Sequence, residues 1–323
     1  MEKLLEVSDL HVAFPSKRET VRAVDGVSFQ VFQGETFGLV GESGCGKSQT
    51  LRSILGLLKQ PGRITGGEIR YKGADIAKMS QRELQKIRGK EISMIFQEPM
   101  SSLNPVYRIG DQMLEMIRTH NKQISKKDAL DQCVEMLKRV GIPSPEKRLN
   151  QYPHEFSGGQ QQRVGIARAL AVKPEFIVCD EPISALDVSI QSQVVNMLED
   201  MQEELGLTYL FIAHDLSVVR HISNRIGVMY LGSLVELGES YELNRNPIHP
   251  YTKTLLSAVP VPDPKLSRSR IVLEGDIPSP INPPSGCRFH TRCPYATEKC
   301  RQEMPKFKEH APGHWAACHL LDQ

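Results

Sequence analysis

Hydrophobic and polar positions follow two periods along the chain, one typical of buried strands and one of amphipathic helices. Short apolar runs at residues 37–40 and 176–179 fit strands that are buried on both faces. Residues 188–206 read VSIQSQVVNMLEDMQEELG, and their apolar side chains recur at helical spacing up to a final glycine: Ile190, Val194, Leu198, Met201 and Leu205. The segment TYLFIAH that follows is the next predicted strand. Strands that alternate with helices predict an α/β fold with a mostly parallel core sheet.

The middle of the chain has helical periodicity and few strand signals. The segments IGDQMLEMIRTHN and SKKDALDQCVEMLKRVGI both place apolar residues on one helical face. Cys133 falls on the second of these faces together with Ala129, Leu137 and Val140, so we predict a core position for it. Cys179, inside the apolar run before Asp180, is predicted to be core as well.

Composition excludes several classes of protein. The 323 residues are 40% hydrophobic and 24% charged with a net charge of +2, so neither a nucleic-acid-binding basic surface nor a disordered acidic tail is expected. The N-terminal MEKLLEVSDL lacks the features of a secretory signal, and no stretch approaches the ~18 apolar residues of a membrane span. We therefore expect a cytosolic globular protein.

The first apolar run leads into a glycine-rich turn and a helix with Leu51, Ile54, Leu55 and Leu58 on one side. Residues 41–48 match G-x-x-x-x-G-K-[ST], in which backbone N–H groups wrap phosphate oxygens, Lys47 reaches the β/γ-phosphates and Ser48 binds magnesium. A glycine turn that binds nothing is the alternative. The predicted nucleotide-binding residues here are Gly41, Glu42, Ser43, Gly44, Cys45, Gly46, Lys47, Ser48 and Gln49, with Cys45 as a small side chain and not a reactive thiol.

The second apolar run ends in a pair of acids, Asp180 and Glu181. Two carboxylates at the end of a buried strand are costly unless they are used. Asp180 fits the Mg²⁺-linked position, and Glu181 fits the group that polarises an attacking water. Because ligands bind at the carboxyl edge of a parallel sheet, we expect both motifs at that edge.

Further motifs make the chain resemble the ATP-binding-cassette (ABC) ATPases. The resemblance rests on the signature Ser157, Gly158, Gly159 and Gln160, on Gln97 in MIFQEP, Asp187 in SALD and His214 in FIAHD, and, more weakly, on Phe14 in LHVAF. It implies that Gln97 contacts Mg²⁺ and the catalytic water, that His214 is a catalytic switch, and that Phe14 stacks on adenine. Two subunits would sandwich ATP between the P-loop of one and the signature of the other. A simple P-loop kinase would leave these motifs unexplained.

The resemblance also implies an architecture. The expected ABC domain covers residues 1–245, with a core at 1–95 and 171–240 that includes an antiparallel β subdomain, and an inserted helical subdomain at about 98–170. Residues 246–323 follow as a small Cys-rich extension, which begins with the HPY segment at His249, Pro250 and Tyr251 and continues through proline-rich PSPINPP.

The extension resembles that of the ATPase subunits of dipeptide and oligopeptide importers. This implies a sister ATPase subunit, as a heterodimer or a homodimer, and a place at the cytoplasmic face of the inner membrane. It also implies two membrane permease subunits, contacted by the segment after Gln97 from Glu98 to Leu103, and an extracytoplasmic binding protein. Dipeptides, oligopeptides and nickel all remain open as the solute. The alternative is a soluble ABC ATPase that acts on nucleic acid or ribosomes, but nine Lys/Arg against seven Asp/Glu in residues 261–323 argue against phosphate-backbone binding.

Four cysteines of the extension form a candidate metal site: Cys287, Cys293, Cys300 and Cys318. In a reducing compartment such a group favours metal binding over disulfides. The spacers of five, six and seventeen residues lack the short C-x(2–4)-C pairs of structural zinc sites, so a 4Fe-4S cluster is predicted. A mixed Cys/His zinc site with His290, His314 and His319 is the second possibility, and free thiols are the third.

Overall fold

The structure is a computed structural model that describes residues 2–17, 19–98, 102–184, 186–213, 215–259 and 271–322. The chain divides into two compact units. Unit 1 consists of Met1–Met79 and Phe211–Gln323, and unit 2 of Ser80–Leu210.

Unit 1 contains an antiparallel four-stranded sheet in the order β2-β1-β4-β5. Its strands are β1 (Lys3–Pro15), β2 (Thr20–Phe32), β4 (Arg63–Tyr71) and β5 (Ala74–Asp75). In β1, Leu5 lies opposite Tyr71 of β4, and both are buried. The sheet confirms the expected antiparallel β component of the fold.

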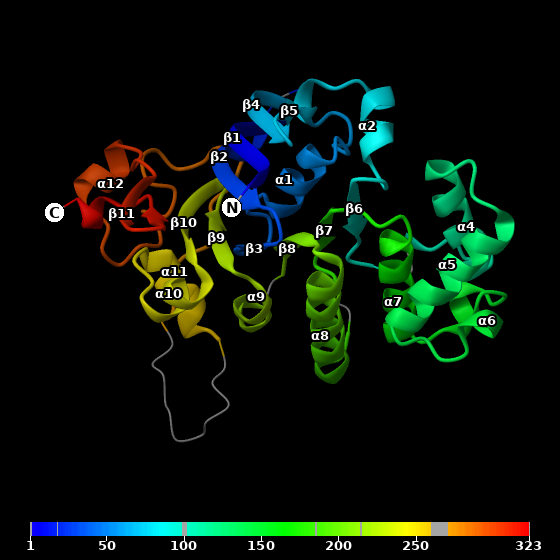
Figure 1. The fold of residues 1–323 in the computed structure, drawn as a ribbon. Coiled ribbons are helices and arrows are strands. Elements are labelled where there is room, and N and C mark those ends of the chain that lie inside the picture. The colour runs from blue at the N-terminus through cyan, green and yellow to red at the C-terminus, as the bar shows by residue number, and fades with distance from the viewer. Residues whose placement is uncertain are drawn as a thin grey trace, which may run out of the picture. The chain divides into compact units, whose positions relative to one another are not determined.

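The core sheet of unit 1 joins strands from both ends of the chain in the order β11-β12-β10-β9-β3. Strand β3 (Thr36–Val40) is parallel to β9 (Arg225–Tyr230), and β10 (Ser233–Glu239), β12 (His314–Ala316) and β11 (Lys308–Ala311) continue antiparallel. The last two strands belong to the Cys-rich extension, which Figure 1 shows in orange and red beside β10. The extension therefore adds strands to the core sheet.

Unit 1 also contains helices. They are α1 (Lys47–Ile54), η1 (Ile76–Lys78), α9 (Leu216–Ile222), α10 (Ser240–Arg245), α11 (Pro250–Ser257), α12 (Glu298–Gln302) and η3 (His319–Leu321). Helix α9 packs directly on β3, because a Cβ at Gly38 would lie 2.4 Å from Val219 Cγ1. Helix α1 is shorter than predicted: it ends at Ile54, Gly56 takes a left-handed φ of 60°, and Leu58 is left half-buried beyond the helix.

Unit 2 is mainly helical around one pair of parallel strands. The strands β6 (Ile92–Ile95) and β7 (Phe176–Asp180) pair directly. The boundary in sequence between unit 2 and unit 1 falls within β8 (Thr208–Ile212), after Leu210. The helices are α2 (Gln81–Ile87), α4 (Ile109–His120), α5 (Lys126–Arg139), α6 (Pro145–Arg148), η2 (Pro153–Glu155), α7 (Gly158–Leu170) and α8 (Val188–Leu205). Helices α4, α5 and α6 gather beside α7 (Figure 1), and α4 and α5 occupy the two segments of predicted helical periodicity.

Most residues predicted to face the core are buried in the structure. Helix α8 ends where Gly206 takes a φ of 65°, and Val194, Leu198 and Met201 are buried, whereas Ile190 and Leu205 are half-buried. Cys133 and Cys179 are both fully buried, and burial raises the pKa of the Cys133 thiol to about 12. Both cysteines are thus inert core residues, as predicted.

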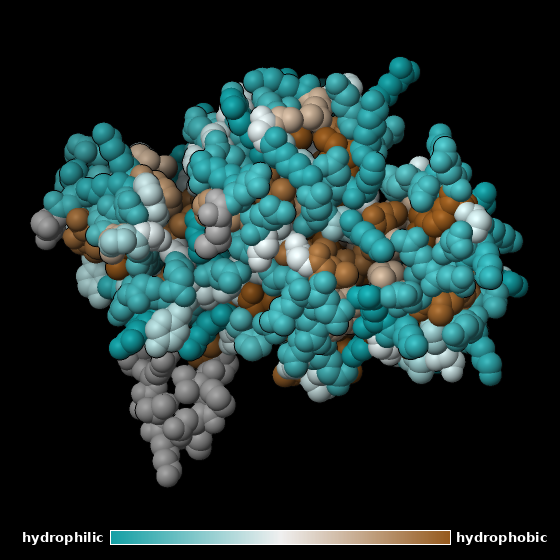
Figure 2. Space-filling model, viewed as in Figure 1, coloured by the Kyte–Doolittle hydropathy of each residue, from teal (hydrophilic) through white to brown (hydrophobic). Residues whose placement is uncertain are grey.

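The visible surface is mostly hydrophilic, with hydrophobic residues in small separate areas (Figure 2). None of the helices in the described part of the chain combines the length and apolar composition that a membrane crossing requires.

Candidate functional site

The glycine-rich turn after β3 surrounds the ammonium group of Lys47. Lys47 is 4% exposed, and its Nζ donates hydrogen bonds to Gly41 O at 2.7 Å and Glu42 O at 3.1 Å. The residue is also the first of helix α1, whose N-terminus carries the partial positive charge of the helix dipole. A buried cation next to a helix N-terminus can hold a polyphosphate.

Two of the predicted glycines are required by close packing. A Cβ at Gly41 would lie 2.2 Å from Met229 O, and one at Gly46 would lie 2.3 Å from Ala23 O. Gly46 also has a φ of 105°, which disfavours any L side chain. The turn therefore lies directly on the β2 and β9 backbones.

Cys45 is a packing residue in this turn. It is 4% exposed, and burial raises the pKa of its thiol even though Lys47 Nζ lies 3.6 Å from its Sγ. A thiol with a raised pKa is a poor nucleophile, which agrees with the prediction of an unreactive side chain.

The acid pair at the end of β7 lies in a strained turn of unit 2. Asp180 and Glu181 are each 6% exposed, and Glu181 has a left-handed φ of 51°. Gln97, which follows β6, donates from Nε2 to Glu181 Oε2 at 2.7 Å. The structure thus brings together two of the three residues predicted to be catalytic. A buried carboxylate held by an amide can orient and polarise a water.

The signature residues form the N-terminus of α7. Ser157 accepts from Gln160 N at 3.4 Å and Gln160 Oε1 accepts from Ser157 N at 3.2 Å, which makes a capping box. Ser157 and Gly158 are exposed, so this helix terminus faces solvent in the single chain. Gln162, one turn further, donates to Pro182 O and ties α7 to the turn of the acid pair. The sequence reasoning had overlooked Gln162.

The remaining predicted site residues occupy three separate places. Asp187 is exposed and is the N-cap of α8. Phe14 in β1 is half-buried with its ring against Gly62, where a Cβ would lie 2.4 Å from Cε1. His214 lies outside the described residues.

The four cysteines of the extension are neighbours. Cys287, Cys300 and Cys318 are buried and Cys293 is half-buried. Burial raises the pKa of the Cys287 thiol to about 11, and the other three cysteines add to this shift through their charge. Burial likewise raises the pKa of Cys293 and of Cys318, and the neighbouring cysteines contribute again.

Neither the predicted 4Fe-4S cluster nor a zinc site that includes the histidines is supported. Within the described residues, no group of three or more His, Cys, Asp or Glu side chains is close enough to hold one metal ion. The histidines have other partners: His314 Nε2 lies 2.8 Å from Glu236 Oε1, His319 Nε2 lies 2.9 Å from Glu303 O, and His290 Nδ1 lies 3.0 Å from Cys287 O.

The extension also contacts the P-loop, which the sequence did not predict. Tyr251 of the HPY segment accepts a hydrogen bond from Glu42 N at 2.9 Å. Arg292 pairs with the Glu42 carboxylate through both terminal nitrogens, at 2.8 and 3.2 Å. Contacts over 209 and 250 positions leave no local signal in the sequence.

Comparisons with known proteins agree with these features. Residues 24–184 match the family model "ABC transporter", and residues 235–300 match "Oligopeptide/dipeptide transporter, C-terminal region". The oligopeptide transport ATP-binding protein AppF of Bacillus subtilis is 53% identical over 99% of this chain and 98% of its own length. OppF of Salmonella typhimurium, also an oligopeptide transport ATP-binding protein, is 52% identical over 94% of this chain and 92% of its own.

A solved structure supports the fold. The dimeric ATP-binding cassette MJ0796, in a post-hydrolysis state bound to ADP and Pi, aligns with a TM-score of 0.66 and 28% identity over 73% of this chain and 98% of that one. Together with the P-loop, the acid pair and the capped signature helix, these matches show that the chain belongs to the ABC transporter ATPases and, within them, to the family of the oligopeptide transport ATP-binding proteins.

Proposed function

We propose that this chain is the ATP-hydrolysing subunit of an importer for di- or oligopeptides. The observation that carries the proposal is the match of residues 235–300 to the C-terminal region of such transporters, on a chain that has all the ABC motifs. The names of AppF and OppF support peptides as the solute class. A soluble ABC ATPase that acts on nucleic acid or ribosomes would leave this region without a purpose.

The residues of the P-loop and of the turn that contains Asp180 and Glu181 have distinct roles in this proposal. Lys47 and the P-loop backbone hold the β/γ-phosphates of ATP, because a buried ammonium and the backbone N–H groups at a helix N-terminus suit oxyanions. Glu181, held by Gln97, polarises the water that attacks the γ-phosphate, and His214 assists as the switch residue. Phe14 stacks on the adenine ring.

Magnesium would be held by Ser48, Asp180 and Gln97. A hydroxyl, a carboxylate and an amide oxygen are ligands that Mg²⁺ prefers, and the buried position of Asp180 favours a cation beside it. When bound, Mg²⁺ neutralises charge on the phosphate oxygens.

A second ATPase subunit completes the proposed site. Ser157, Gly158 and Asp187 are exposed, so they are available to a partner, and the related cassette MJ0796 is described as dimeric. The partner is a sister subunit or a second copy of this chain. The pair would bind two permease subunits at the cytoplasmic face of the inner membrane, and an extracytoplasmic binding protein would deliver the peptide to the permeases.

The permease contact is proposed near the segment after Gln97. Phe96, Val106 and Tyr107 near this segment are exposed by 42%, 72% and 56%, so these large apolar side chains are available to a partner. Leu103, which the family resemblance placed in this contact, is 3% exposed and is a core residue instead. Residues 99–101 of the predicted contact lie outside the described residues.

The four cysteines are proposed to hold a 4Fe-4S cluster. A single zinc bound at 2.3 Å would bring tetrahedral sulfurs to within about 3.8 Å of one another. The cysteines influence one another's pKa, yet no described group is gathered tightly enough for one ion. What supports the proposal is the mutual proximity of the four thiols and the absence of short zinc-type pairs in the sequence, since 4Fe-4S clusters are held by four Cys thiolates. The cluster would supply a cross-link within the extension.

Reconstitution tests the transport function. The chain should co-purify with permease subunits encoded beside it and drive ATP-dependent peptide uptake into proteoliposomes, and Glu181→Gln should abolish the uptake. An ATPase that binds no permease and is stimulated by RNA or ribosomes would refute the proposal. Iron, sulfide and zinc analysis after anaerobic purification tests the cluster, and stoichiometric zinc without iron would refute it.

A further inference from the structure

Glu42, the second residue of the P-loop, is held through three different groups. Its carboxylate pairs with both terminal nitrogens of Arg292, and its N–H donates to the Tyr251 hydroxyl. Its carbonyl accepts from Lys47 Nζ at 3.1 Å. The first two contacts come from the extension, and the third comes from the lysine that is proposed to bind phosphate.

The two residues that hold Glu42 from the extension rest on a buried aromatic group. Tyr230, Tyr251 and Phe289 are each at most 1% exposed, and their ring centroids lie 4.7 to 5.3 Å apart. The Arg292 guanidinium lies over the Tyr230 ring, 6.0 Å from its centroid. Packed rings and a bidentate ion pair leave these groups little freedom, so they fix the position of Glu42.

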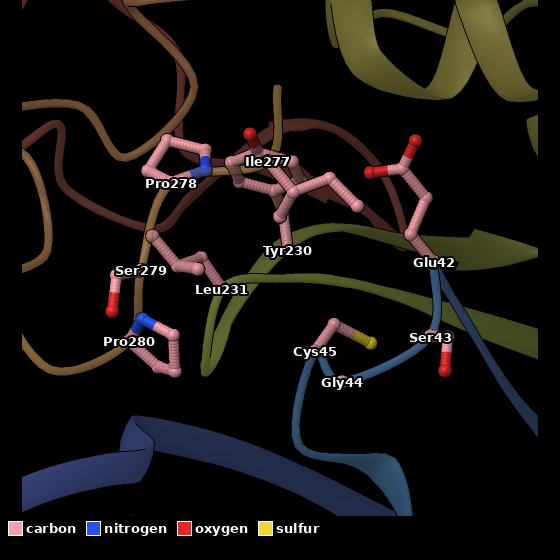
Figure 3. Close-up of a pocket in the computed structure, with 10 residues that line it drawn as sticks. All are labelled: Glu42, Ser43, Gly44, Cys45, Tyr230, Leu231, Ile277, Pro278, Ser279 and Pro280. Carbon is pink, nitrogen blue, oxygen red and sulfur yellow. The ribbon is translucent and has the colours of Figure 1, made fainter.

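A second segment of the extension also lies near the turn. Residues 277–280 face Glu42, Ser43, Gly44 and Cys45 across a cavity of about 260 Å³, which also borders Tyr230 and Leu231 (Figure 3). This segment is anchored to the core, because Pro280 O accepts from Arg22 N at 3.3 Å. Two separate segments of the extension therefore lie beside the P-loop turn, and both are attached to the core.

We infer that the extension braces the P-loop and that Arg292 and Tyr251 are positioning residues for nucleotide binding. The inference rests on the proposed ATPase function and adds to it a role for the extension. By fixing the Glu42 peptide, the two residues fix the carbonyl that orients Lys47 and the N–H groups that follow it. A preorganised loop binds its ligand more tightly, because less conformational entropy is lost on binding.

A purely structural role for the extension makes a different prediction, and Arg288 distinguishes the two. Arg288 lies in the same segment and pairs with Asp25 of β2 at 2.6 Å, with 13% of its side chain exposed against 9% for Arg292. Its ion pair anchors the extension to the core without touching the P-loop. Arg288→Gln is therefore a matched control that removes an equally buried ion pair.

The experiment measures the Kd for MgADP by calorimetry and the KM for ATP, both with the full chain. We expect Arg292→Gln to raise both constants about five- to tenfold, since the lost pair is charge-assisted and bidentate. Tyr251→Phe keeps the ring in place but leaves Glu42 N–H without its acceptor, and we expect about a threefold rise, typical of one neutral hydrogen bond. In both variants kcat should change less than KM, and Arg288→Gln should leave both constants within about twofold of wild type.

The possible results separate the hypotheses. Unchanged affinity in Arg292→Gln and Tyr251→Phe, with or without a lower melting temperature, would overturn the brace and leave the ATPase function intact. Equal weakening in Arg288→Gln would overturn it as well. If Arg292→Gln does not fold, Tyr251→Phe decides by the same measurement. A wild-type chain that fails to bind MgADP would instead overturn the proposed function.

Discussion

Replacing Glu181 by glutamine removes one negative charge from the acid turn and little else. Glutamine has nearly the same volume, and its carbonyl can still accept the 2.7 Å hydrogen bond from Gln97 Nε2. The bond then joins neutral groups and loses about half of its strength, so the free energy of unfolding should change by less than about 1 kcal/mol. The variant should therefore fold and bind nucleotide like the wild type.

The rate of hydrolysis should fall far more than the stability. An amide cannot accept the proton of the attacking water, and a positioned general base contributes about 10²- to 10⁴-fold to a rate. Each factor of ten corresponds to about 1.4 kcal/mol, so the barrier should rise by about 3 to 5.5 kcal/mol. Because Glu181 is only 6% exposed, bulk water cannot readily replace the missing carboxylate, and the upper part of this range is expected.

Steady-state phosphate release and MgATP titration measure the two effects separately. Glu175→Gln is the matched control, since Glu175 is exposed and directly precedes the same strand, β7. We expect the control to retain full activity. Turnover within about threefold of wild type in Glu181→Gln, with normal nucleotide binding, would show that Glu181 is not the base.

Three further variants test other parts of the structure. Lys47→Ala should weaken MgATP binding about ten- to a hundredfold in a calorimetric titration, since it removes a buried phosphate-facing charge; unchanged affinity would contradict its role. Tyr107→Ala should cut peptide uptake in proteoliposomes and spare basal ATPase activity, whereas equal loss of both would indicate misfolding. Burial lowers the pKa of His249 to about 4, so the unfolded chain, with its histidine near 6.5, binds more protons between these pH values. The buried neutral His249 therefore contributes all of its stabilisation above about pH 6.5, and urea titrations should show the free energy of unfolding falling by about 2 kcal/mol from pH 7 to pH 5. An equal fall in His249→Asn would refute the assignment.

The parts of the site that the sequence could predict are those formed by short continuous segments. The P-loop, the acid pair and the signature each occupy fewer than ten consecutive residues, and each lies at the end of a strand or the start of a helix. The periodicity of α5 and α8 similarly reflects contacts between residues three and four apart. Such features depend on short-range geometry, which a single sequence records directly.

The rest depended on contacts between distant residues. Strands β11 and β12 are four and three residues long, too short for a clear period-two pattern, and pairing with β10 stabilises them. The extension therefore looked like an irregular linker and cysteine cluster in the sequence. The pairing of Arg292 with Glu42 left no trace either, because an arginine in a polar loop reads as a solvated charge.

The conformation of Glu181 shows why the acid turn needs its surroundings. A φ of 51° is unfavourable for a glutamate and costs about 1 to 2 kcal/mol, which a glycine would avoid. The turn maintains this conformation because the Glu181 carbonyl accepts from Ser184 N and Oγ, at 3.3 and 3.1 Å, while Gln97 holds the carboxylate. These bonds fix both ends of the residue and direct its carboxylate toward Gln97. A residue that is strained, buried and charged at once is destabilising on every count, so its presence is best explained by the chemistry that a glycine could not perform.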